Sequence, residues 1–127
     1  MNQILIPVAP GELVDKLTIL QIKSERIKDE VKLENIKKEL SLLLETCSKN
    51  SVDLNHEFVA ELKKINEALW EIEDDIRDKE RSKEFDEVFI KLARDVYITN
   101  DKRCRVKNKI SNLIGSEFIE EKSYSAY

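Results

Sequence analysis

Three groups of polar side chains have the spacing of a helix face. The first contains Asn66, Trp70, Glu73 and Arg77, which lie four, three and four residues apart. Since an α-helix has about 3.6 residues per turn, this spacing places the four side chains on one face. They could line a ligand pocket, with Glu73 as a candidate acid–base group. Alternatively, Trp70 covers the edge of a core and Glu73 pairs with Arg77 at the surface.

The second group is cationic and lies on the first predicted helix. It contains Lys16, Lys23 and Arg26, which lie beside an apolar stripe. Three cations on one rigid helix could bind a carboxylate or a phosphate, and Arg26 could do so through two parallel hydrogen bonds. Alternatively, their long side chains extend along the helix flank and pair with acidic residues of neighbouring helices, such as Glu73, Asp74 or Asp101.

The third group interrupts the apolar stripe of the last predicted helix. Thr99 and Arg103 occupy stripe positions, and the polar residues around them are Arg94, Tyr97, Asn100 and Asp101. A buried charge is costly unless it is paired, so an inward-facing Arg103 would need a carboxylate or a ligand. Asp101 is a second candidate acid–base group. Alternatively, this part of the helix extends past its neighbours and Arg103 faces solvent.

Metal-dependent and nucleophilic chemistry find little support in the sequence. Acidic pairs three residues apart, which bind Mg²⁺ in all-helical nucleotide pyrophosphatases, occur five times. Random placement of the 26 acidic residues would give about five such pairs. The one histidine, His56, is distant in sequence from both cysteines. We therefore predict no metal site and no cofactor, and a metal-dependent nucleotide pyrophosphatase stays the weaker alternative function.

Composition restricts the class of protein. A chain of 127 residues with 38% charged residues and net charge −4 fits one helical domain, because only 2 Gly and 2 Pro are present. The acidic balance argues against nucleic-acid binding, and the basic run from Lys102 to Lys109 lacks interleaved aromatic residues. The apolar run at 4–8 is too short for a membrane span or a signal peptide. We expect a cytoplasmic protein without membrane contact.

Apolar periodicity predicts an all-α bundle of three long antiparallel helices in a single domain. An extended segment over 1–9 precedes a helix over 10–47, whose stripe changes phase near 29–32 and predicts a bend or break there. A second helix over 54–80 and a third over 83–114 follow, and then a tail over 116–127 that carries Phe118, Ile119, Tyr124 and Tyr127. Helices of this length expose apolar stripes unless another subunit covers them, so we expect a homodimer.

The chain also resembles a family of small uncharacterised bacterial and phage helical proteins, a domain of unknown function often found near surface-polysaccharide and glycosyltransferase genes. The resemblance spans most of the chain and rests on the run Pro10 to Leu20, Lys23, Arg26, the run Leu69 to Asp74, Arg77, Phe85-Asp86, Leu92-Ala93-Arg94, Tyr97, Asn100-Asp101, Arg103 and the run Glu120 to Tyr124. It implies a fold and a set of positions but no reaction. The positions coincide with the three polar groups above, so we expect these groups to share one cleft.

These observations favour a non-catalytic binding or adaptor module whose polar cleft holds an anionic metabolite, a sugar phosphate or a segment of a partner protein. The alternative is an enzyme acting on an anionic small molecule, with Glu73 or Asp101 as acid–base group and cations as ligand clamps: Lys16, Lys23, Arg26, Arg77 and Arg94. Long antiparallel helices with inward cations look like the helical chorismate mutases. That likeness is an analogy of fold.

Overall fold

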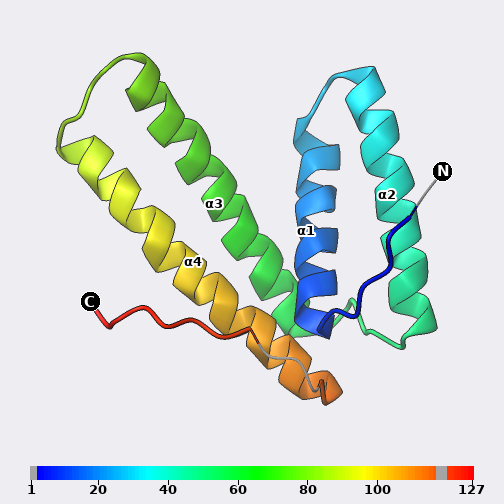
Figure 1. The fold of residues 1–127 in the computed structure, drawn as a ribbon. Helices are drawn as coiled ribbons and strands as arrows, with labels where there is room; N and C mark the ends of the chain where they lie inside the picture. Colours follow the sequence, from blue (N-terminus) through cyan, green and yellow to red (C-terminus); the bar gives the residue numbers. More distant parts are fainter. Residues whose placement is uncertain (1–2, 117–119) are drawn as a thin grey trace.

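The computed structural model describes residues 3–116 and 120–127 and contains four α-helices there, which form two antiparallel hairpins (Figure 1). The first hairpin joins α1 (Pro10–Arg26) to α2 (Glu30–Lys49), and the second joins α3 (Glu57–Arg81) to α4 (Glu87–Ile114). The all-helical class is confirmed. The predicted number of three helices is wrong, because the segment 10–47 forms two helices.

The chain reverses direction between α1 and α2. Ile27 leaves the helix with an extended backbone, and Asp29 begins the next helix by accepting a hydrogen bond from the Lys32 N–H at 2.9 Å. An Asp at this position satisfies one of the unpaired N–H groups of a helix start. The change of stripe phase near 29–32 therefore marks a tight turn between two helices.

The later helices begin slightly after their predicted starts. His56 precedes α3 and accepts a hydrogen bond from the Phe58 N–H, and Asp86 precedes α4 and accepts one from the Phe89 N–H. Ser82, which directly precedes the predicted start of the last helix at 83, is the residue that ends α3.

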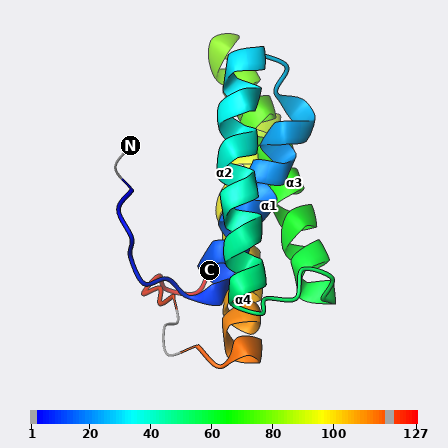
Figure 2. The same ribbon diagram turned by 90° about the vertical axis from the view of Figure 1, so that its right-hand side faces the viewer.

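Helix α1 lies at the centre of the fold and contacts all three other described helices, whereas α2 contacts only α1 among them (Figures 1 and 2). One apolar cluster joins α1 to the second hairpin and consists of Val14, Val59, Leu62, Val106 and Ile110. Burial of these aliphatic side chains is the main stabilising term for such a junction. The hairpins meet at this end, here called the base, and diverge toward their distal turns (Figure 1).

The two terminal segments are not helical. Residues 3–9 are extended and project away from the helices, and Ile4 and Leu5 are about nine-tenths exposed (Figure 2). Residues 120–127 return along α4, where the Asn108 side chain bonds both the N–H and the C=O of Glu120. Phe118 and Ile119 of the predicted tail lie outside the described residues. No helix within the described ranges has the length and apolar character to cross a bilayer.

Candidate functional site: a polar cleft between two helical hairpins

A buried polar network joins α1, α3 and α4 next to the apolar cluster at the base of the fold. Asp15 of α1 is 3% exposed, and its two carboxylate oxygens accept hydrogen bonds from Nε and Nη2 of Arg103 on α4, at 2.9 and 2.5 Å. Asn66 of α3 donates from Nδ2 to Asp15 Oδ1 at 2.9 Å and to Thr18 Oγ1 at 3.0 Å. The carboxylate that an inward Arg103 requires is therefore Asp15.

This network leaves specific hydrogen-bonding capacity for a ligand. A guanidinium group has five N–H donors, and Asp15 engages two of those of Arg103. Both N–H donors of Asn66 are used, so its amide oxygen remains as an acceptor. The hydrogen bond with Asp15 raises the pKa of Arg103 above its ordinary value, although burial acts in the opposite direction. The guanidinium is therefore a fixed, charged donor.

A cleft of about 490 Å³ lies directly beside this network, between α1 and the α3–α4 hairpin. Its size is within the range of small-molecule sites. The apolar lining comes from Ile19, Ile22, Leu69 and Trp70, and the polar lining from Asn66, Glu73, Asp74, Arg77, Asn100 and Arg103. Aromatic and aliphatic side chains together with amide, carboxylate and guanidinium groups could hold a small ligand that has both an apolar face and polar substituents.

A second charge cluster closes the base of the fold. Lys107 of α4 is 7% exposed, and its Nζ lies 2.7 Å from a carboxylate oxygen of Glu12 on α1 and 2.7 Å from one of Glu120 in the tail. Burial acts to lower the pKa of Lys107, but the two carboxylates outweigh it and the pKa lies above its ordinary value. Lys107 also holds the pKa of Glu120 below its ordinary value. The cluster therefore joins α1, α4 and the tail.

The structure brings together only some of the predicted site residues. Six residues of the three polar groups line the cleft: Asn66, Trp70, Glu73, Arg77, Asn100 and Arg103. Arg26 lies at its edge, where it pairs with Glu71 and has its guanidinium carbon 5.8 Å from the centre of the Trp70 ring.

The other predicted residues lie elsewhere. Lys16 pairs with Glu39 of α2 at 2.9 Å, so the cations of α1 do not converge on one ligand position. Lys23 and Arg94 do not line the cleft, and Arg94 is exposed. Tyr97 and Asp101 line a separate cavity beneath the tail, where Asp101 accepts a hydrogen bond from the Tyr127 hydroxyl at 2.8 Å. The cleft therefore joins the first polar group to Asn100 and Arg103 of the third, whereas Tyr97, Arg94 and the lysines of α1 lie apart from it.

Sequence reasoning did not identify Asp15 and Thr18 as members of the site, since it followed one apolar stripe along α1. A second buried file on the same helix contains Gly11, Val14, Asp15, Thr18 and Ile22. Successive residues of this file are three, one, three and four positions apart. This spacing places them on a second face of the helix. A helix with two buried faces has neighbours on both sides, and that pattern is visible in the sequence.

Comparison with known proteins identifies a family but no activity. Within the described residues no group of three or more His, Cys, Asp or Glu side chains is placed to hold a metal ion. No curated protein and no solved structure matches the chain. One family model, described as a family of unknown function, matches residues 4–127. The chain therefore belongs to this family of unknown function, DUF6165.

Proposed function

We propose that the protein is a non-catalytic binding module whose cleft between the two hairpins takes a small polar ligand, such as a sugar phosphate. The observation that carries the proposal is the buried Asp15, which orients Arg103 and Asn66 toward α1 before any ligand arrives. Preorganised polar groups lower the entropic cost of binding. Three guanidinium donors and one amide acceptor then remain for the ligand.

The other lining residues suit a ring that bears hydroxyl and phosphate groups. Trp70 offers a flat apolar surface, and Asn100 offers both a donor and an acceptor. Arg77 pairs with Glu73 on the exposed side of the cleft, so it can change partner at small cost. A phosphate group can replace the Glu73 carboxylate as the partner of Arg77. The resemblance to proteins found near surface-polysaccharide genes makes sugar phosphates the first compounds to test.

The single tryptophan provides a direct test, because Trp70 is the only one in the chain and lines the cleft. We would titrate glucose 1-phosphate, glucose and inorganic phosphate while recording tryptophan fluorescence. We expect a saturable change with the sugar phosphate and weaker responses to its two parts. The proposal would be contradicted if a panel of sugar phosphates changed neither the tryptophan fluorescence nor the melting temperature.

Two arginines of α3 supply a matched pair of variants. Arg77 lines the cleft and pairs with Glu73, whereas Arg81 lies outside it and pairs with Asp78. Arg77→Ala should weaken binding by about tenfold or more, since a charge-assisted hydrogen bond contributes on the order of 1.5–3 kcal/mol. Arg81→Ala should leave the Kd unchanged. Equal losses in both variants would show a general charge effect and no site.

An enzymatic role would depend on Glu73, because it is the one of the two candidate acid–base residues that lines the cleft. Glu73→Gln distinguishes the two roles. In a binding module the variant keeps its affinity for the ligand within a few-fold, and no conversion of bound ligand occurs with either protein. If the wild type converts the ligand and Glu73→Gln binds without converting it, the protein is an enzyme.

The homodimer expected from the helix lengths stays a prediction. In support of it, Ile4, Leu5, Ile6 and Val8 of the extended segment are 48–90% exposed, which is an apolar surface that a second subunit could cover. Native mass spectrometry of freshly purified protein tests this directly, and the same spectrum reports any ligand that remains bound. A single monomer mass at micromolar concentration would refute the dimer.

A further inference from the structure

Helix α4 divides its basic run between two sides of the fold. Arg103 and Lys107 point to α1 and are paired with carboxylates there. Lys102, Arg105 and Lys109 instead line a groove of about 300 Å³ between α3 and α4. Their spacing of three and four residues places them on one helix face. The run therefore contains an outward-facing cationic group that the cleft does not use.

This groove has an excess of positive charge although the chain as a whole is acidic. Lys64 of α3 is the fourth cation of the lining, Glu61 is the one acid among the described residues that line it, and Ile65 and Val106 supply apolar surface. The ion pair between Lys109 and Glu61 is long, at 4.0 Å. The chain has a net charge of −4, so this groove is a local exception. Its excess of positive charge attracts anions.

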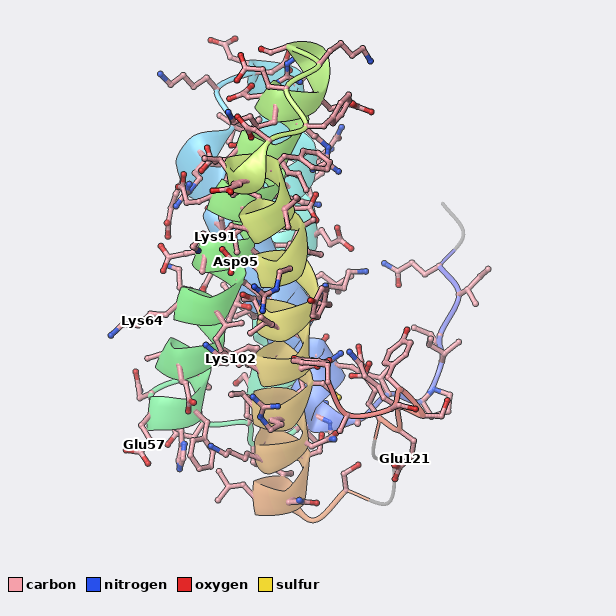
Figure 3. The ribbon with its side chains drawn as sticks, turned by 90° about the vertical axis from the view of Figure 1, so that its left-hand side faces the viewer. Glu57, Lys64, Lys91, Asp95, Lys102 and Glu121 are labelled. Carbon is pink, nitrogen blue, oxygen red and sulfur yellow. The ribbon has the colours of Figure 1, made fainter. Side chains whose placement is uncertain are left out.

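The surroundings limit the size of the anion. Figure 3 shows Lys102 reaching from α4 toward α3 and Lys64 extending outward from α3. Glu57 lies beyond one end of these lysines, and the Lys91–Asp95 pair, 2.7 Å apart, lies beyond the other. The positions from 102 to 109 span about 10 Å of helix. A compact anion fits this length, whereas an extended polyanion would meet the flanking carboxylates.

We propose that the groove lined by Lys64, Lys102, Arg105 and Lys109 is a second ligand site, for a compact anion with two adjacent phosphate groups. Two adjacent phosphate groups can contact both Lys102 and Lys109, which lie at the two ends of this set of α4 cations. The Arg105 guanidinium can donate two parallel hydrogen bonds to one of the phosphates. The groove differs in composition from the cleft beside Trp70, which carries carboxylates and guanidinium groups together.

Isothermal titration calorimetry with inorganic pyrophosphate tests the site. We expect one binding event, at least tenfold tighter than that of inorganic phosphate and weakened by added salt. The double variant Lys102→Ala/Arg105→Ala should weaken pyrophosphate binding at least tenfold. Its matched control is Lys32→Ala/Lys37→Ala, which removes two exposed cations from α2, and there the Kd should change less than twofold. All four side chains are exposed, so both variants should melt like the wild type.

Several results would overturn the proposal. Absence of pyrophosphate binding at millimolar concentration, or equal losses in the two double variants, would each remove the site. Preferred binding of a single-stranded oligonucleotide or of phosphatidylglycerol vesicles, lost in Lys102→Ala/Arg105→Ala, would show that the groove serves a macromolecule or a membrane. The fluorescence of Trp70 should not respond to pyrophosphate, so failure of this site and failure of the cleft are distinguishable.

Discussion

Both ends of the α3–α4 hairpin are rich in ion pairs, but only the end at the base of the fold buries them. At the base, the side chains of Asp15 and Lys107 are 5% and 8% exposed in their ion pairs. At the distal end, Arg81 and Asp78 are each 68% exposed. Exposed pairs contribute little to stability, whereas a buried charge without its partner is strongly destabilising. The same residue types therefore position helices at one end and face solvent at the other.

The largest effect should come from removing a buried carboxylate. Asp15→Ala leaves Arg103 and Asn66 without their shared acceptor, so we expect a loss of about 3–5 kcal/mol in unfolding free energy, measured by urea denaturation. Asp78→Ala at the distal end should change it by less than about 1 kcal/mol. Similar losses for the two variants would remove the distinction between the ends.

The second-largest effect should come from a substitution at Gly11, where α1 closely approaches α4 at the base. A Cβ at Gly11 would lie 2.1 Å from the carbonyl oxygen of Lys107, which is a backbone atom that cannot move alone. Gly→Ala within a helix normally stabilises by about 0.5–1 kcal/mol. Here we expect the opposite sign, a destabilisation of about 3 kcal/mol, at the upper end of the overpacking range. An increased melting temperature for Gly11→Ala would contradict the close approach.

A smaller, pH-dependent effect should come from the tail. Since Lys107 lowers the pKa of Glu120 below its ordinary 4.5, this pair stabilises the folded state above that pH and is lost as the pH falls through the folded-state value. Glu120→Gln should cost about 1 kcal/mol at pH 7 and less at pH 3, because the ion pair is lost as the carboxylate becomes protonated. The neighbouring exposed Glu121→Gln is the control and should be neutral at both pH values. A cost of Glu120→Gln that does not depend on pH would show that the ion pair is not its cause.

The smallest effect should come from the exposed pair at the cleft. Arg77 and Glu73 are four residues apart on α3, with side chains 61% and 41% exposed. Arg77→Ala should therefore lower the unfolding free energy by about 0.5 kcal/mol or less, as seen in thermal melts. If Arg77→Ala lowered the unfolding free energy by more than about 2 kcal/mol, the pair would contribute as much as a buried one. Weaker ligand binding by this variant could then result from partial unfolding.

Local patterns in the sequence accounted for most of the helices. Apolar periodicity over 54–80 predicted α3, and that over 83–114 predicted α4, because a repeat of 3.6 residues is a property of adjacent turns. The stripe phase near 29–32 marked a discontinuity but did not show whether the helix bends or the chain reverses. Asp29 as N-cap and the extended Ile27 decide that it reverses.

The part of the site that lies on one helix face was also predictable, because spacing along a single helix is a local property. The face with Asn66, Trp70, Glu73 and Arg77 does line one cleft, since neighbours on a helix face stay together in any packing arrangement. The cations of α1 were misplaced because their partners depend on which helix lies beside them. Lys16 faces α2, and no local pattern specifies that neighbour.

Local patterns alone specify an all-helical chain with amphipathic helices and an extended start, because periodicity is a local property. They also show that an inward Arg103 needs a carboxylate or a ligand, because a buried charge is costly wherever it lies. Helix packing makes Asp15 the partner of Arg103 and divides the basic run of α4 between two sides of the fold. These choices depend on the rotation of each helix about its axis and on contacts between residues as far apart as 15 and 103. Such contacts exist only once the helices are packed.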